Sequence, residues 1–552
     1  MSLRRILSCV CPLVLVHLLW CVNAAAEDAA DKAMQAIQSE TLRAEMGFLS
    51  DDLLEGRDTG SRGYDIAAKF LATQFVASGL KPGGENGSFL QTIPFRSMRA
   101  DASRSTVTLV RNGKEEKLVF AQDFLVHADP GRGSVTVEAP VVFAGFGVTA
   151  PEQNYDDYKG IDVRGKIVAL IHSAPNFSSS IKAHYTSSEI KAQTAAKHGA
   201  VGIIVLNDPI LEKHYSFSMR VRDLAFAEMN WLDRQGHPND YFTELKCAAS
   251  LSMDATRKFL AGAPHSADEI FAAEQDGRSF SFDLPFTAKI TTVTDAMDIS
   301  GSNVVAVLEG SDPALKNEYV VYSAHLDHLG IGQAVDGDKI YNGTLDNASG
   351  SATLLELARA FSQMNPRSKR SILFVAVAGE EEGLLGSDYF AHYPTVAKKS
   401  IVANINVDEV LMLWPMEDVI AFGAEHSTLG GVIKKAADRM HVTVSPDPMP
   451  EEVIFIRSDQ YSFVKQGIPA VMPSTGFKSD NPAIVPMNIF GTWEDTRYHQ
   501  PQDDMNQPGL DFESAAKFAR FAFLCGYLVS EDPKRPTWNK GDFFGDKYHG
   551  AD

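Results

Sequence analysis

The sequence predicts a mixed α/β protein in which helices cover both faces of a sheet, preceded along the chain by a smaller α/β unit. Two observations lead to this fold class. From Phe280 onward, short apolar runs of the length of buried strands alternate with segments of helical period. The chain also has 552 residues, which is the length of two to four ordinary domains.

Composition excludes several classes of protein. Hydrophobic residues make up 44% and charged residues 22% of the chain, which are ordinary globular values and exclude collagen-like, coiled-coil and wholly disordered chains. The net charge of −20 would repel a phosphate backbone, so nucleic acid is not an expected partner. No stretch after residue 26 is apolar for long enough to span a membrane.

Residues 1–26 have the layout of a secretory signal peptide, with Arg4 and Arg5, an apolar run over 6–20 and small residues at 24–26. An uncleaved signal anchor is the alternative. The protein is therefore expected to be exported, either to a periplasm or to the medium. Cleavage would leave two cysteines, Cys247 and Cys525, and the sequence does not establish whether they form a disulfide.

The elements follow from local patterns. Residues 27–133 read as helices over 33–54 and 64–79 around a Gly/Asp-rich turn, followed by short alternating strands from 105. A second unit is expected over 134–276, with strands at 141–144, 166–171 and 201–206 and a helix at 189–198. Over 277–552, strands are expected at 304–308, 319–324, 371–378, 401–407 and 469–472, with helices at 349–361, 381–392 and 429–440. The helix at 349–361 presents Leu354, Leu355, Ala358 and Phe361 on one face.

Residues that can bind metals follow directly on several predicted strands. His325 and Asp327 follow the first, Glu380 to Glu382 the second and Asp408 the third, while Asp346 precedes a helix. Ligands of open α/β sheets bind beyond the carboxyl ends of strands. Imidazole and carboxylate together suit zinc, and a pair of metals needs a bridging carboxylate, for which Asp346 is a candidate. No HExxH or GxSxG motif occurs.

Taken together, these segments resemble an M28-type zinc aminopeptidase. The resemblance rests on motifs in the expected order, namely His325-Leu326-Asp327, Asp346-Asn347-Ala348-Ser349-Gly350, the run from Glu380 to Ser387, Asn406-Val407-Asp408, Arg457-Ser458-Asp459 and Tyr498-His499-Gln500-Pro501. Residues 49–57 also resemble the opening segment of such exopeptidases, and residues 157–166 resemble part of a protease-associated (PA) domain. The resemblance implies a three-layer α/β/α zinc exopeptidase domain made of 27–133 and 277–552, with a PA domain inserted at 134–276.

The resemblance also implies roles for individual residues. His325 and Asp408 would bind one metal, Glu381 and His499 the other, and Asp346 both. Glu380 would be the general base. Asp327 would orient His325, and Tyr498 and Arg457 are candidates to stabilise the oxyanion. His328 is expected to line the pocket. The cofactor would be two zinc ions, with cobalt or manganese as alternatives.

The expected function is that of an exported di-zinc aminopeptidase acting on the N-termini of peptides or proteins. A carboxypeptidase or dipeptidase of the same fold is one alternative, and a peptide-binding protein without activity is another. One departure from the family pattern is Glu409, where an apolar residue is usual. Simple strand alternation would turn Glu409 away from Asp408. It could line the substrate pocket, pair with a base or alter the charge of the site, and its role stays open, as do the preferred N-terminal residue and the oligomeric state.

Overall fold

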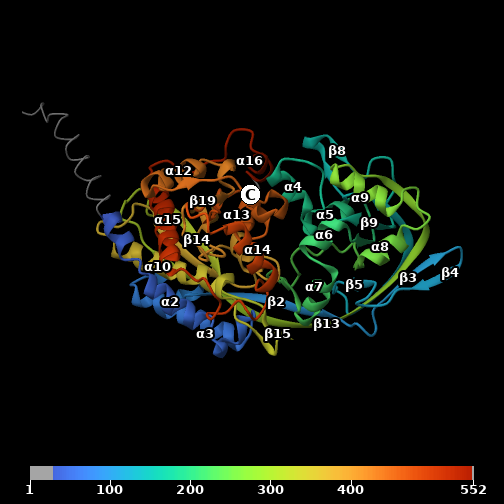
Figure 1. Cartoon of the computed structure of the whole chain (residues 1–552), viewed down its shortest axis with the longest axis horizontal. Coiled ribbons are helices and arrows are strands. Elements are labelled where there is room, and N and C mark those ends of the chain that lie inside the picture. The colour runs from blue at the N-terminus through green and yellow to red at the C-terminus, as the bar shows by residue number, and fades with distance from the viewer. Residues whose placement is uncertain (1–28, 550–552) are drawn as a thin grey trace, which may run out of the picture.

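The computed structural model describes residues 29–549. The predicted signal peptide at 1–26 lies outside the described residues. Figure 1 shows two parts side by side, with α10 and α15 in one and α8 and α9 in the other, joined by the long strand β13. Between residues 29 and 549 no helix combines the length and apolarity needed to cross a lipid bilayer.

The larger part is built on a mixed sheet. Its strands lie in the order β2 (Leu90–Ala100), β13 (Ser281–Leu308), β17 (Ser371–Val377), β14 (Tyr319–His325), β18 (Ile401–Asn406), β21 (Ala470–Thr475) and β19 (Asp418–Phe422). The four strands from β17 to β21 are parallel, and the outer pairings are antiparallel. The predicted mixed α/β class is therefore confirmed.

Helices cover both faces of this sheet. One face carries α2 (Ser39–Leu49), α3 (Arg62–Ala77), α10 (Ser349–Gln363), α12 (Leu429–Met440) and α15 (Phe512–Glu531). The other carries α11 (Leu385–His392), α13 (Gln460–Lys465) and α16 (Phe543–Tyr548). Neighbouring strand residues alternate between the two cores, since Tyr322 packs in the first and Val321 in the second. This alternation produces the expected three layers.

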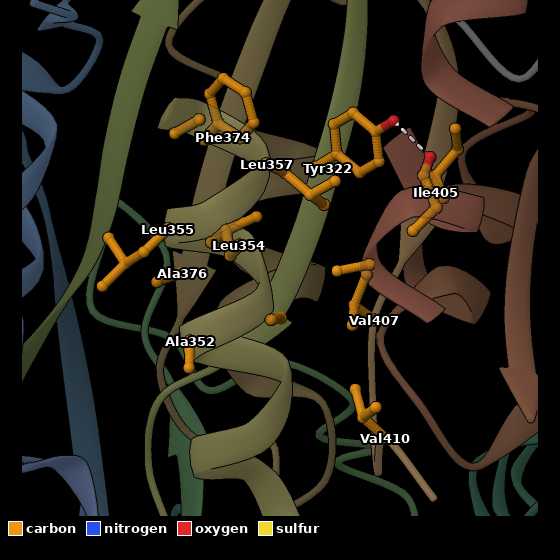
Figure 2. Packing of buried hydrophobic residues seen from close by; sticks show 14 of the residues in the cluster. Tyr322, Ala352, Leu354, Leu355, Leu357, Phe374, Ala376, Ile405, Val407 and Val410 are labelled. Carbon is orange, nitrogen blue, oxygen red and sulfur yellow. Dashed lines mark hydrogen bonds between the residues drawn. The ribbon is translucent and has the colours of Figure 1, made fainter. Parts of the chain in front are cut away.

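Helix α10 is anchored in the first core, and it begins directly after the loop that carries Asp346. Its predicted apolar face, Leu354, Leu355, Ala358 and Phe361, is buried throughout. Figure 2 shows part of this core around Leu354 and Leu357. Each leucine buried here contributes about 1.5–3 kcal/mol, so the start of α10 is held firmly against the sheet.

The smaller part has its own sheet and core. Its strands lie in the order β4 (Lys114–Lys117), β3 (Thr106–Arg111), β13, β6 (Ser134–Ala144), β9 (Ile167–Ile171), β10 (Gly202–Leu206), β12 (Ala248–Leu251) and β5 (Phe124–Val126). Helices α5 (Ser188–Lys197), α8 (Met253–Phe259) and α9 (Ala267–Gln275) pack on it. This core draws on residues from Val107 to Ile290, beyond both ends of 134–276. Its identity as a PA domain stays a prediction.

Two predicted helices are shorter than expected. The helix at 33–54 is interrupted at 36–38, where Ile37 is buried and the N–H of Gln38 donates to Glu356 of α10. The helix at 381–392 begins only at Leu385, because Glu380 to Leu384 form a turn in which two N–H groups donate to the Glu380 carbonyl. A side chain at Gly386 would collide with the Ala378 carbonyl, so only glycine permits this close start of α11.

The two cysteines that the structure describes are both free and buried. Cys525 lies in the first core of the larger part and Cys247 in the core of the smaller part. The disulfide that the sequence left open is therefore not formed in this structure.

Candidate metal centre

The ends of three parallel strands bring the predicted ligands to one edge of the main sheet. Strand β14 ends at His325, while Glu381 follows β17 and Asp408 follows β18. Asp346 lies in an irregular turn at Thr344–Ala348, just before α10, and the Asp346–Asn347 peptide bond is cis. His499 follows α14 (Pro486–Thr496). Residues separated by up to 174 positions thus meet at the site where the sequence places them.

Asp346 lies between two imidazoles. Its Oδ1 is 3.1 Å from Nε2 of His325, and its Oδ2 is 3.2 Å from Nε2 of His499. Each histidine has a second carboxylate beside the same nitrogen: Asp408 Oδ1 at 3.1 Å from His325, and Glu381 Oε2 at 3.1 Å from His499. The five predicted ligands form two His–carboxylate pairs that share the two oxygens of Asp346.

This donor set fits divalent metal ions. Ligand atoms bound to a tetrahedral zinc at about 2.0–2.2 Å are roughly 3.3–3.5 Å apart, which is close to the contacts around Asp346. Atoms of His325, Asp346 and Glu381 lie close enough together to hold one ion. The His325 side chain is 1% exposed and that of His499 is 28% exposed, so the cluster is open on the His499 side.

A pocket adjoins the cluster. Glu380, Asp346 and Asp408 line it together with apolar residues from several loops: Leu411, Phe422, Met449, Ile454, Met472, Phe477, Phe490 and Trp493. Burial raises the pKa of Glu380 well above its ordinary value; His325 opposes this shift, while Asp408 and Glu381 add to it. Glu380 therefore faces the pocket beside the cluster and holds a proton more tightly than an exposed glutamate.

Tyr498 and Arg457 also line this pocket. The Tyr498 ring stacks on His499, with ring centroids 3.9 Å apart. Arg457 Nη1 lies 3.6 Å from Oε2 of Glu452. Although burial opposes the shift, Tyr498, Glu409 and Glu452 raise the pKa of Arg457, so its charge is permanent. Both residues are near enough to the cluster to face a substrate bound there.

Asp327 and His328 lie behind the cluster. His325 Nδ1 is 3.2 Å from the backbone oxygen of Asp327 and 4.0 Å from its carboxylate, which accepts a hydrogen bond from the Glu381 N–H. His328 is fully buried, with Nδ1 2.5 Å from Glu381 Oε1. The expectation that His328 lines the pocket is wrong, because its ring lies against Glu381 on the inner side of the cluster.

Asp503 supports the bridging residue and was missed by the sequence analysis. It is buried, and its carboxylate accepts hydrogen bonds from the N–H groups of Leu345 and Asp346 at 3.0–3.1 Å. Gln507 donates to the same carboxylate at 2.6 Å. A signal was present, since the acidic pair Asp503-Asp504 begins only four residues after His499.

Arg57, at the end of the segment 49–57, forms hydrogen bonds with loops of the site. Its guanidinium is buried and donates to four backbone carbonyls, those of Leu49, Leu326, Asn342 and Gly343. Leu326 follows His325, and Gly343 precedes the turn of Asp346. The resemblance noted at residues 49–57 therefore has a physical counterpart, because Arg57 joins the two loops that carry these ligands.

Glu409 faces the pocket rather than turning away from it. It lines the pocket beside Asp408 and Asp346. Its φ of 44° is left-handed, so the chain leaves the strand pattern here and strand alternation no longer applies. Of the alternatives left open by the sequence, the structure favours pocket lining; the expectation of an opposite face assumed that the extended backbone continues through residue 409.

The smaller part reaches the edge of the pocket. His214, at the end of α6 (Pro209–His214), lies 2.5 Å from Glu452, which lines the pocket. Nearby, His184 of α4 (Ser179–Thr186) lies 2.6 Å from the Tyr461 hydroxyl of α13. Ser180 donates to Glu425. These contacts hold the two parts together beside the pocket opening.

Comparison with known proteins finds a family match for the region that contains the cluster. Residues 303–524 match the model of peptidase family M28. This region is an M28 peptidase domain. It contains His325, Asp346, Glu381, Asp408 and His499, so the matched region and the cluster coincide.

Similar proteins agree with this assignment. A probable zinc metalloprotease of Pyrenophora tritici-repentis (strain Pt-1C-BFP) is 38% identical over 109 residues, which are 20% of this chain and 24% of that protein. The alkaline phosphatase isozyme conversion protein of Escherichia coli (strain K12) is 32% identical over 148 residues, 26% of this chain and 40% of that protein. The chain thus matches a quarter to two fifths of the length of these relatives.

A solved structure supports the fold over most of the chain. The aminopeptidase from Aneurinibacillus sp. strain AM-1 superposes with a TM-score of 0.53, covering 92% of this chain and 97% of that protein at 19% identity. At this identity the likeness concerns the fold alone. It extends well beyond the M28 domain in both directions.

Proposed function

We propose that this protein is an exported aminopeptidase that uses two zinc ions to hydrolyse the N-terminal bond of peptides. The observation that carries the proposal is Asp346, whose two oxygens each face a different imidazole at 3.1–3.2 Å. A carboxylate in that position can bridge two ions. His325 and Asp408 would complete one site, and Glu381 and His499 the other. The resemblance to aminopeptidases noted in the sequence supports the same reading.

Three residues of the pocket would assist the hydrolysis that the metals activate. When bound, two zinc ions would polarise the scissile carbonyl and make the attacking water more acidic. Glu380 would accept a proton from that water and deliver it to the departing amine. Arg457 and Tyr498 face the same pocket and would stabilise the negative charge that develops on the carbonyl oxygen.

Export is part of the proposal and rests on the sequence pattern of residues 1–26 alone. Zinc is proposed over cobalt and manganese because histidine and carboxylate ligands suit it and because a curated relative is named a zinc metalloprotease.

The test is the release of free amino acids from a panel of unblocked peptides and their N-acetylated twins. Purified protein would be assayed as isolated, after chelation and after zinc is restored. We expect cleavage of the unblocked peptides only, lost with the chelator and recovered with zinc. Cleavage of the acetylated set from its carboxyl ends would instead indicate a carboxypeptidase, and no cleavage despite bound metal would contradict peptidase activity.

The role of Glu380 is tested by Glu380→Gln. Removing the proton acceptor should lower kcat by at least about 10²-fold, because a positioned general base contributes about 10²–10⁴. The zinc content should not change, since Glu380 is outside the contacts that join the ligands. Glu382→Gln is the matched control, because Glu382 is a neighbour in the same acidic run that does not line the pocket. Near-normal turnover in Glu380→Gln would refute the assignment.

A further inference from the structure

Glu409 is a pocket carboxylate that the proposed mechanism does not use. It lines the pocket with Asp346, Glu380 and Asp408, and its left-handed φ of 44° fixes that direction. The contacts that join the five ligands do not include it. Its presence beside the reaction centre is therefore not explained by metal binding.

The walls of the pocket that Glu409 lines are largely apolar, with Leu411, Phe422, Met472 and Trp493 among them. A carboxylate in such surroundings is costly unless a cation or a donor pairs with it.

The cations near this part of the pocket are shared with other carboxylates. His499 faces Asp346 and Glu381. Arg457 lies beside Glu452 and also interacts with Glu409 and Tyr498. Glu494 adds a further carboxylate to the lining. Besides Glu380, three glutamates outside the ligand set, at 409, 452 and 494, thus line the pocket with a single arginine, and the pocket favours a positively charged ligand.

From this arrangement we propose that Glu409 binds the positively charged nitrogen of the first residue of the substrate. The inference rests on the proposed aminopeptidase function and deepens it. Glu409 is adjacent in sequence to Asp408 and shares the pocket with Glu380, so a nitrogen held there is near the reacting carbonyl. The positive charge could belong to the α-ammonium group or to the side chain of an N-terminal lysine or arginine. The aliphatic part of such a side chain would lie along the apolar walls.

The experiment measures binding without turnover. The zinc-loaded Glu380→Gln protein would be titrated calorimetrically with leucine amide, Nα-acetyl-lysine amide and Nα-acetyl-leucine amide. The first carries only an α-amine, the second only a side-chain amine, and the third neither. The same titrations would be run after adding Glu409→Gln, Glu409→Met or, as the matched control, Glu451→Gln, an exposed glutamate outside the pocket lining.

We expect both Glu409 variants to weaken one amine ligand by about 10- to 100-fold, the range for loss of a charge-assisted hydrogen bond. If only the affinity for leucine amide falls, Glu409 binds the α-ammonium group. If only the affinity for Nα-acetyl-lysine amide falls, Glu409 binds the side-chain ammonium group. The neutral ligand and Glu451→Gln should show no change. Unchanged affinities for all three ligands, or equal weakening of all three, would overturn the proposal.

Zinc content and melting temperature are measured on each variant. If one Glu409 variant does not fold, the other still tests the proposal. Failure of the proposed function is distinguishable, because it appears as a wild-type enzyme that cuts no unblocked peptide. Failure of the present inference appears as amine binding that does not depend on residue 409.

Discussion

Asp503 controls the bridging carboxylate through the backbone. It holds the N–H groups of Leu345 and Asp346, so it fixes the turn that aims Asp346 at both imidazoles. In Asp503→Asn, the amide nitrogen would face these donors in one orientation, and the charge that strengthens the bonds would be lost. We expect metal affinity or kcat/KM to fall by about 10- to 100-fold, as for other groups that orient metal ligands.

Metal titration of the Asp503→Asn protein and steady-state kinetics check this expectation. Asp504→Asn is the matched control, since the neighbouring carboxylate caps Asn506 at an exposed position and does not reach the turn. If the two variants bind metal equally well, Asp503 has no positioning role.

A second prediction concerns His499 and the number of bound zinc ions. Its Nε2 pairs with Glu381 and one oxygen of Asp346, whereas His325 pairs with Asp408 and the other oxygen. Replacing His499 with alanine should therefore reduce the bound zinc from two ions to about one and abolish most activity. Elemental analysis of the purified protein measures this number. His392→Ala, at the end of α11, is the control, and two retained ions in His499→Ala would contradict the assignment.

The sequence located the proposed ligands but not the groups that hold them. His325, Glu381 and Asp408 were predictable because each directly follows an apolar strand, and ends of parallel strands meet at one edge. Asp503 and the buried contact of His328 with Glu381 depend on how distant loops pack, which no local pattern encodes. The direction of Glu409 depends on a left-handed backbone at a residue other than glycine, which sequence patterns rarely reveal.

At the scale of elements, several positions were predicted closely, and the helices expected to begin at 349 and 429 are observed as α10 and α12 with those starts. The strand expected at 319–324 is observed as β14 over Tyr319–His325, because a buried apolar run bounded by polar residues has few alternatives. The helix expected at 381–392 begins only at Leu385, because the N–H groups of Gly383 and Leu384 donate to the Glu380 carbonyl in a turn.

The packing of α2 on α10 predicts a pH dependence of stability. Glu45 of α2 is buried, with Oε1 2.7 Å from Arg359 of α10 and no partner for Oε2 among the described residues. Burial raises the pKa of Glu45 from 4.5 to about 8; Arg359 opposes the shift and Glu356 adds to it. Between these two values the folded protein retains a proton that the unfolded chain releases. The free energy of unfolding therefore falls as pH rises through this window.

Glu45→Gln removes this titration, so its free energy of unfolding should fall less between pH 5 and pH 8, by about 1–3 kcal/mol relative to the parent. Urea unfolding at the two pH values gives the difference. Glu40→Gln, on the same helix but with a side chain that is 82% exposed, should follow the parent. Parallel behaviour of all three proteins would show that Glu45 does not titrate differently on folding.

At the scale of the whole molecule, one strand links two sheets and two separate cores. Strand β13 pairs with β6 through its first half and with β2 through its second half, without an intervening loop. The sequence separated the two parts by composition and strand spacing, but it could not show that they share a strand. That continuity depends on the register of pairing at residues 293 and 294, where the partner changes from β6 to β2.

This architecture predicts a protein that does not depend on a disulfide. Cys247 and Cys525 lie in different cores and are both buried, and burial raises the pKa of the Cys247 thiol to about 12. Neither thiol is therefore a reactive thiolate at neutral pH. We expect a reductant to leave the melting temperature unchanged, and a thiol reagent to label both cysteines only after denaturation. A melting temperature that falls with reductant would show that a bond between cysteines stabilises the protein, and rapid labelling of the native protein would show that a core opens.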